Sequence, residues 1–369
     1  METSTSNSQG NNRNQLGSTA PKPQMPIGCW RQILVASFFL FCSRKAIRTG
    51  LRISHNSLSL LGAMRILSLV PDNSQPIEAI NKLFDQARAV NGRQLALHSA
   101  ASALNQHWPE YLMEAGELAL FMVSACLFTA LLEYPGSPAS RLIPSSFART
   151  ALIGLAMGAT AVAINFSAWG KQSGAHMNPA LTMSFFRLKK IQPWDAVFYI
   201  IAQFAGGIAG VAVSAILLGM IIKHPTVNYA VTHPGPAGVG VAAAAETIIS
   251  FFLLLTVLIV SNSRIWNHFT PLFAGTLVAT YITFEGPFSG MSMNPARTFG
   301  SAFMAWSFDS LWVYFVAPPI GMLLAAEVYL RFRSARSVYC AKFHHANTKR
   351  CIFVCNYAEL MKGESSIAV

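Results

Sequence analysis

Long stretches without a charged side chain are the feature that most constrains how this chain of 369 residues can fold. No Asp, Glu, Lys or Arg occurs between Asp195 and Lys223, and none occurs between Arg149 and Lys171. A helix needs about 20 mainly apolar residues to cross the hydrocarbon core of a bilayer. Both stretches are long enough, so they predict membrane-spanning helices rather than helices of a water-soluble core.

Six apolar stretches of this kind follow one another along the chain. They lie at about residues 111–132, 150–168, 194–222, 240–261, 268–284 and 309–330. The composition agrees, because only 11% of the residues are charged, whereas soluble domains carry about 25%. The sequence therefore predicts an all-α, multi-pass integral membrane protein, with the lipid bilayer as its surroundings.

The net charge of +12 raises the question of a nucleic-acid partner, which the distribution of the charge excludes. The basic residues do not form patches interleaved with aromatic residues. They gather instead in the N-terminal region, in the connection spanning residues 171–190 and in the C-terminal tail, whereas the third-to-fourth connection holds only Lys223. Because cytoplasmic loops collect Lys and Arg, six spans predict that both termini are cytoplasmic. We expect the plasma membrane as the location.

Three regions follow from this pattern: an N-terminal extension (1–108), a core that holds the predicted membrane spans (109–331) and a basic cytoplasmic tail (332–369). The first 28 residues are rich in Ser, Asn, Gln and Gly and predict disorder. The apolar run from Ile33 to Cys42 is too short to span a bilayer. It indicates either a segment lying on the membrane surface or a translation start placed too far upstream.

The six cysteines do not have the spacing of a disulfide scaffold. Five of them, Cys29, Cys42, Cys340, Cys351 and Cys355, fall in regions predicted to be cytoplasmic, where thiols stay reduced. The tail pattern Cys340-x₃-His344-His345-x₅-Cys351-x₃-Cys355 matches none of the usual zinc spacings. We therefore expect a basic, membrane-proximal tail, no metal site and no cofactor.

Two connections contain nearly the same ten residues. Residues 173–182 read SGAHMNPALT and residues 289–298 read SGMSMNPART, so that 7 of the 10 positions are identical. Each copy follows the second span of a three-span half. Because three is an odd number, the second half is inserted upside down, and the two copies enter from opposite faces. Inverted repeats of this kind place their functional site near the bilayer midplane.

The Asn-Pro-Ala core of each copy is suited to starting a helix inside the membrane. Pro fits the first helical turn, and Asn before it is a good N-cap. The mainly apolar residues that follow are enough for a helix that crosses half of the membrane. Two such half-helices would direct their positive dipole ends at one point.

The paired motifs Asn178-Pro179-Ala180 and Asn294-Pro295-Ala296, with Arg297 after the second motif, resemble the aquaporin (major intrinsic protein) family. The resemblance implies six tilted spans and two re-entrant half-helices around an hourglass-shaped pore, assembled as a homotetramer. It implies passive passage of water and of small uncharged solutes, with exclusion of ions and protons. Two alternatives are a facilitator for glycerol, urea or metalloid acids, and a structural membrane protein that does not conduct. The chain shows no enzyme constellation.

The same resemblance assigns roles to individual residues. Asn178 and Asn294 would donate hydrogen bonds to passing water, and Arg297 would form the narrow selectivity filter. Glu114 and Glu246 would accept backbone amides of the re-entrant loops, with Glu117 as the alternative to Glu114. His176 would brace the first loop.

The filter partners of Arg297 are expected to be Ile282, Met291 and either Met157 or Gly158. Strict water channels of the family usually have His where Ile282 stands, which counts against exclusive water selectivity. Thr298 favours the water type, because glycerol facilitators typically have Asp at that place.

Overall fold

The computed structural model describes residues 99–333 and 337–362. The described residues all belong to one compact unit, Leu83–Val369. The predictions for Ile33 to Cys42, including Cys29 beside it, and for the first 28 residues fall outside the described residues.

The described part of the chain is helical and contains no strand. Its main helices are α4 (Ala100–Glu133), α6 (Ser146–Phe166), α8 (Pro179–Arg187), α9 (Pro193–Leu218), α10 (Val239–Ser261), α11 (Thr270–Phe284), α13 (Pro295–Ala305) and α14 (Leu311–Phe332). Short helices connect or follow them: α5 (Pro138–Leu142), α7 (Ala168–Ser173), η1 (Ile221–Lys223), η2 (Asn228–Ala230), η3 (Asn267–Phe269), α12 (Gly286–Ser289) and α15 (Tyr357–Lys362).

Five helices of the described residues are long and apolar enough to cross a membrane: α4, α6, α9, α10 and α14. They coincide with five of the six predicted spans. The sixth predicted span, 268–284, forms α11, which has only 15 residues. α11 begins directly after the 3₁₀ helix η3, with Pro271 in its first turn. It ends at Phe284, where the chain turns before the short helix α12, whose first turn contains Pro287. A proline at the start of each of these helices thus separates α11 from its neighbours.

The first long helix begins earlier than the predicted boundary. α4 starts at Ala100, inside the segment assigned to the N-terminal extension, and the Ser99 side chain caps it by accepting a hydrogen bond from the Ser102 amide at 3.1 Å. Pro109 lies inside this helix and does not end it, since α4 continues to Glu133.

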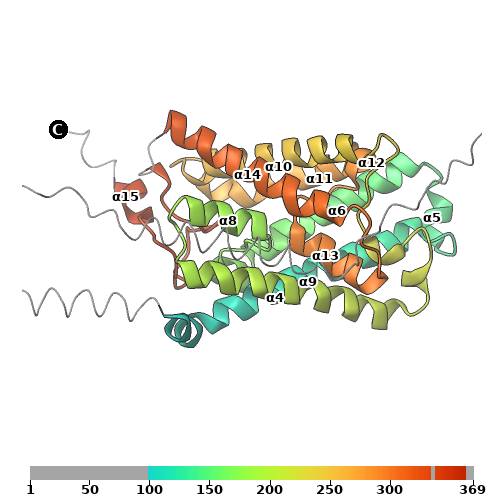
Figure 1. Ribbon diagram of the computed structural model, residues 1–369, viewed down its shortest axis with the longest axis horizontal. Helices are drawn as coiled ribbons and strands as arrows, with labels where there is room; N and C mark the ends of the chain where they lie inside the picture. Colours follow the sequence, from blue (N-terminus) through green and yellow to red (C-terminus); the bar gives the residue numbers. More distant parts are fainter. Residues whose placement is uncertain (1–98, 334–336, 363–369) are drawn as a thin grey trace, which may run out of the picture. The chain divides into compact units, whose positions relative to one another are not determined.

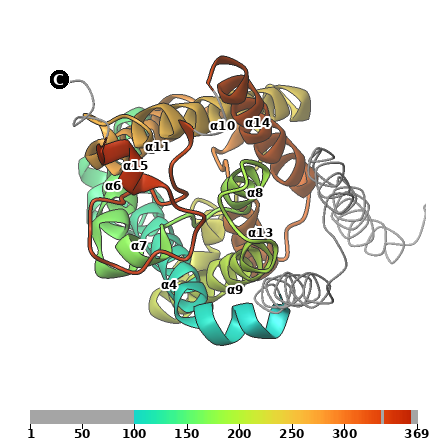
Figure 2. The same cartoon turned by 90° about the vertical axis from the view of Figure 1, so that its left-hand side faces the viewer.

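The long helices lie side by side, and the half-helices α8 and α13 lie among them (Figure 1, Figure 2). α4 packs against α9, α6 against α11, and α10 against α14. Each half-helix also packs against the last long helix of the other half: α8 contacts α14, and α13 contacts α9. The two halves are therefore interlocked, as an inverted repeat requires.

Polar and apolar side chains are distributed as in a protein surrounded by lipid. Leu155 and Ile216 expose 63% and 82% of their surface. Glu114, Gln203 and Glu246 are each fully buried, at 0% exposure. Ionisable groups inside a membrane helix face the protein interior and mark functional paths, so this interior is where a site is expected.

Close approach of α4 and α9 depends on glycine. A Cβ atom built on Gly206 would lie 2.1 Å from the Ala115 carbonyl oxygen, and one on Gly210 would lie 2.4 Å from the Ala119 carbonyl oxygen. Small residues allow helix backbones to approach in this way in lipid, where dispersion contacts hold helices together.

We predict that Gly206→Leu disrupts this contact and sharply lowers the yield of monodisperse protein after extraction into detergent. Gly240→Leu is the matched control, because a Cβ there would meet no atom within 4 Å. Size-exclusion chromatography at equal expression measures the outcome, and equal elution profiles for the two variants would contradict the packing argument.

Candidate pore

The two re-entrant loops have the same backbone conformation. Three pairs of equivalent residues have positive φ: Gly174 (96°) with Gly290 (76°), Ala175 (53°) with Met291 (48°), and Met177 (49°) with Met293 (54°). Residues other than glycine rarely adopt this left-handed region. Such strain persists only when the surroundings hold it, so the contacts around each loop are the next question.

The Met residue before each Asn forms two backbone hydrogen bonds. Its amide donates to a Glu side chain of its own half, and its carbonyl accepts from the Asn of the other half. The Met293 amide donates to Glu246 Oε2 at 2.7 Å, and its carbonyl accepts from Asn178 Nδ2 at 2.6 Å. In the other half, the Met177 amide donates to Glu114, and its carbonyl accepts from Asn294 Nδ2 at 2.6 Å. The two motifs are thus joined by reciprocal hydrogen bonds.

Both Asn residues also cap the half-helices that they precede. Asn178 Oδ1 accepts from the Ala180 amide at 2.9 Å, and Asn294 Oδ1 accepts from the Ala296 amide at 3.0 Å. Pro179 and Pro295 occupy the first turns of α8 and α13. These contacts fix the oxygen of each amide group, so that its nitrogen faces the opposite loop.

One N–H of each Asn amide is left over. An amide group has two N–H donors, and one of them is used by the carbonyl of Met177 or Met293. Among the described residues, no hydrogen bond from the second N–H of Asn178 or Asn294 is formed. Each of the two Asn residues retains 8% exposure. The N-terminus of each half-helix therefore carries one amide donor without a partner among the described residues, and a small polar molecule is a suitable acceptor for it.

Glu246 holds the second loop with three hydrogen bonds. Its Oε1 accepts from the Ser289 hydroxyl and from the Ser292 amide, both at 2.7 Å, and its Oε2 accepts from Met293 as described above. A fully buried carboxylate is costly unless it is hydrogen-bonded. Here it offsets that cost by binding loop amides that would otherwise be unpaired.

The first loop uses two acidic residues where the second uses one. Glu114 accepts from the Met177 amide and from Gln203 Nε2, the latter at 2.8 Å. Glu117 accepts from the Ser173 hydroxyl at 2.7 Å. The structure therefore places both alternatives of the sequence analysis against the loop, with Glu114 on the backbone amide next to the motif.

Some supporting residues were missed by the sequence analysis. Tyr199 donates to the Ser173 carbonyl at 2.7 Å, and Tyr314 donates to the equivalent Ser289 carbonyl. Gln203 joins Glu114 to Thr182 at 3.0 Å. The identity of Ser173 and Ser289 at the start of both repeats was the available signal, whereas nothing in the sequence pattern distinguishes Tyr199 from a core aromatic residue.

Comparisons with known proteins agree with this geometry. The sequence profile described as "Major intrinsic protein" matches residues 103–329. The chain is 32% identical to Aquaporin NIP2-1 of Oryza sativa subsp. japonica, over 69% of this chain and 82% of that protein. It is 38% identical to Aquaporin AqpM of Methanothermobacter thermautotrophicus, over 48% of this chain and 74% of that protein.

The profile match alone covers more than half of the chain. The chain belongs to the major intrinsic protein family. Its fold is similar to that of the aquaglyceroporin from Plasmodium falciparum, with a TM-score of 0.51 and 23% identity over 61% of this chain and 96% of that one. As a member of the family it is a transmembrane channel and not an enzyme.

The expected filter residues of this channel differ in burial and in their polar contacts. Ile282 is half-buried on α11 and Met291 is buried, and both belong to one large apolar cluster. The Arg297 amide donates to Asn294 Oδ1 at 3.2 Å, and its Nη1 has no hydrogen-bond partner among the described residues. A buried guanidinium nitrogen without a partner in the protein is a donor that a passing molecule can use.

Both filter candidates on α6 are buried. A Cβ atom at Gly158 would lie 2.4 Å from the Gly275 carbonyl oxygen of α11, so Gly158 lies at the contact between these two helices. Met157 is 2% exposed. Both residues stay candidates for the filter.

His176 connects the first loop to the C-terminal segment. Its Nδ1 lies 3.1 Å from Thr182 Oγ1, and its Nε2 lies 2.9 Å from the Ala341 carbonyl oxygen. Because a carbonyl only accepts, Nε2 carries the proton and donates it. The ring stacks between Phe185 and Phe353, with centroids 5.1 and 5.3 Å away.

The C-terminal residues 337–362 therefore pack against the channel, and Figure 2 shows this red segment crossing the end of the bundle in front of α7. Arg350 donates to Glu110 Oε1 at 3.0 Å, and this buried carboxylate raises the pKa of Arg350 above its ordinary value. The tail is therefore held against the channel by specific contacts, which the sequence expectation of a basic, membrane-proximal tail did not include.

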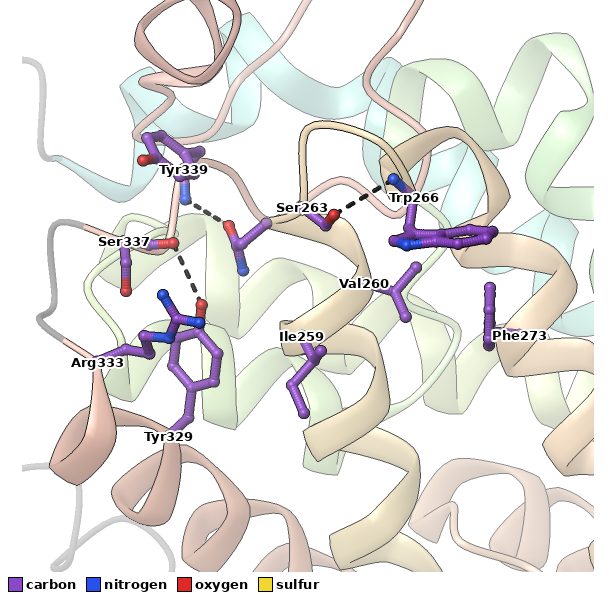
Figure 3. Close-up of a pocket in the computed structure, with 10 residues that line it drawn as sticks. Ile259, Val260, Ser263, Trp266, Phe273, Tyr329, Arg333, Ser337 and Tyr339 are labelled. Carbon is purple, nitrogen blue, oxygen red and sulfur yellow. Dashed lines mark hydrogen bonds between the residues drawn. The ribbon is translucent and has the colours of Figure 1, made fainter. Parts of the chain in front are cut away.

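A cavity of about 560 Å³ lies where the tail leaves α14. Figure 3 shows the Tyr339 amide, which donates to Asn262 at 2.8 Å, and Tyr329, which donates to the Ser337 carbonyl at 3.4 Å. Neither Asn-Pro-Ala motif contributes to its lining. The cavity is therefore part of the tail junction and not part of the pore.

Proposed function

We propose that the chain conducts water, lets small uncharged solutes pass more slowly, and excludes ions and protons. The observation that carries this proposal is the reciprocal pair Asn178–Met293 and Asn294–Met177, each bond 2.6 Å long, which leaves one N–H of each amide unused. A water molecule whose oxygen accepts both donors is oriented by them. It then cannot pass protons in both directions, and the two helix dipoles repel cations.

Selectivity rests on Arg297 and the apolar side chains near it. The guanidinium group is a fixed cation and repels other cations. Ile282 adds an apolar wall where a His would add a second polar group. Such a wall accepts the carbon side of a small polyol or urea, and Met291 is flexible enough to narrow the path without closing it.

The proposed setting follows the charge distribution. The basic connection and tail favour a cytoplasmic C-terminus, and a plasma-membrane location is proposed with it. Exposed apolar side chains on the helix faces are compatible with lipid and with a homotetramer in which each subunit has its own pore. Cross-linking of the protein in bilayers, read as the largest covalent species, tests the tetramer.

We predict that Ile282→His lowers glycerol and urea permeability at least about threefold while changing water permeability less, because the filter gains a polar group and loses apolar contact. Arg297→Val is expected to raise solute permeability. Light scattering from proteoliposomes under sorbitol, glycerol and urea gradients measures all three rates. Ile259→His on the α10 end is the matched control.

Two results would change the proposal. Equal glycerol and water rates in the wild-type protein would favour a solute facilitator. Wild-type exclusion of glycerol and urea together with no effect of Ile282→His would remove Ile282 from the filter.

A further inference from the structure

The C-terminal segment brings together four side chains that are good ligands for a soft metal ion. They are Cys340, His345, Cys351 and Cys355, and their sulfur and ring-nitrogen atoms all lie within 4.8 Å of one another. Cys340 Sγ lies 3.6 Å from Cys351 Sγ, and Cys355 Sγ lies 3.0 Å from His345 Nε2. The first is buried and the last is exposed, so the cluster is at the surface of the segment with one closed side.

These separations are close to those of a tetrahedral site. With Zn–S near 2.3 Å and Zn–N near 2.0–2.1 Å, tetrahedral ligand atoms are about 3.5–3.8 Å apart. The Cys340–Cys351 Sγ distance of 3.6 Å falls within that range, and the Cys355 Sγ–His345 Nε2 distance of 3.0 Å is about 0.5 Å shorter. All pairs of ligand atoms lie within 4.8 Å, so small side-chain rotations bring them to tetrahedral spacing. Three thiolates and one imidazole are also a ligand set that zinc prefers over harder cations such as Mg²⁺ or Ca²⁺.

Surrounding groups support the ligands. The Tyr357 amide donates to Cys355 Sγ at 3.5 Å, and the His345 ring stacks on the Tyr357 ring with centroids 4.2 Å apart. Partners of this kind fix the orientation of metal ligands. The neighbouring His344 is turned away, with its ring 5.0 Å from Phe166.

The loop between the ligands is wrapped around one lysine. Lys342 Nζ donates to the Arg350 carbonyl at 2.7 Å and to the Lys349 carbonyl at 3.4 Å, within the same segment. It also donates to the Lys171 carbonyl of α7 at 2.9 Å. A Zn²⁺ ion bound by three thiolates and one neutral imidazole would form a site with a net charge of −1. The buried ammonium group of Lys342, in the same segment, would offset this negative charge.

The ligands alternate along the chain with residues that contact the two ends of the first re-entrant segment. After Cys340, the Ala341 carbonyl accepts from His176, and the Phe343 amide donates to the Gly174 carbonyl at 3.4 Å, both in the loop before Asn178. Before Cys355, the Val354 amide donates at 2.9 Å to the carbonyl of Lys190, which follows α8. A metal would therefore join one strip of chain that lies on the loop before Asn178 to another that lies at the end of α8.

We propose that Cys340, His345, Cys351 and Cys355 bind one Zn²⁺, which fixes the C-terminal segment against the loop that precedes Asn178. This proposal departs from the sequence expectation of a tail without a metal site. The spacing is unusual because the chain between the ligands folds around Lys342 instead of forming a short knuckle. The proposal is independent of which solutes the channel passes.

The metal content of the purified full-length protein tests the first half of the proposal. Protein extracted in detergent under reducing conditions should contain one Zn²⁺ per chain, as measured by inductively coupled plasma mass spectrometry. Cobalt reconstitution should give the absorption of tetrahedral, thiolate-bound Co²⁺. His345→Gln and the double variant Cys351→Ser/Cys355→Ser should lose the metal, whereas the matched control His344→Gln should keep it.

Hydrogen exchange tests the second half. Removal of the metal by a chelator should speed exchange of the Phe343 and Val354 amides at least about tenfold, because local opening exposes both donors, and added Zn²⁺ should restore protection. Absence of zinc, unchanged zinc in the variants, or a Cys340–Cys351 disulfide found by peptide mapping would overturn the site. Bound zinc without any change in exchange would overturn its role in holding the segment.

Discussion

Replacing Asn294 by Asp is expected to lower water permeability per channel by at least about tenfold. The change removes both amide N–H donors and places a carboxylate oxygen 2.6 Å from the Met177 carbonyl oxygen, where a hydrogen bond exists now. Losing the bond and setting two acceptors against each other costs about 1–3 kcal/mol of stability. The permeation barrier rises for a separate reason, because a passing water loses a donor and meets a new charge between the two motifs. A rise of about 1.4 kcal/mol in that barrier lowers the rate tenfold.

Asn228→Asp is the matched control, since it makes the same chemical change in η2. Both variants are reconstituted at equal density, verified by quantitative blotting, and their shrinkage is followed by stopped-flow light scattering. Wild-type permeability in Asn294→Asp would contradict the assignment of Asn294 to the water path.

The second large effect is expected for Glu246→Gln, which should destabilise the folded protein by about 3 kcal/mol. The carboxylate accepts three hydrogen bonds, from the Ser289 hydroxyl and from the Ser292 and Met293 amides, each 2.7 Å long. In the Gln variant one oxygen can still accept, but the NH₂ group replaces the other acceptor. One or two of the three donors then lose their hydrogen bond. Hydrogen bonds to charged groups contribute about 1.5–3 kcal/mol each, and a buried donor left unpaired adds to the loss.

Glu327→Gln makes the same change at an exposed ion pair with Arg187, 2.7 Å long, where an effect below about 1 kcal/mol is expected. Thermal unfolding in detergent, followed by tryptophan fluorescence, compares the two variants with the wild-type protein. Equal midpoints for Glu246→Gln and Glu327→Gln would show that the loop does not depend on this carboxylate.

Much of the architecture could be predicted from the sequence, since lipid requires long apolar helices and the repeat fixes their inversion. The position of α8 and α13 followed from Asn178-Pro179 and Asn294-Pro295 alone, because cap and first-turn preferences are local. The structure confirms the predicted caps, which the side chains of both Asn residues form.

What the sequence could not supply were contacts between residues far apart in the chain. Nothing local indicates that Tyr199 reaches the Ser173 carbonyl, or that Gly158 faces Gly275. The same limit applies to the tail, where His345 joins three cysteines only because Lys342 folds the intervening chain around itself. Spacing rules describe short knuckles and do not anticipate such a loop.

The central claim is that the crossed Asn amides pass water and block protons. Water and proton permeability are therefore measured in the same proteoliposomes, the first by light scattering after an osmotic step and the second by an enclosed pH-sensitive dye after a pH step. The account predicts that water permeability rises with protein density while proton permeability stays at the level of protein-free vesicles. Water permeability no higher than that of protein-free vesicles, or a proton leak that grows with protein density, would contradict it.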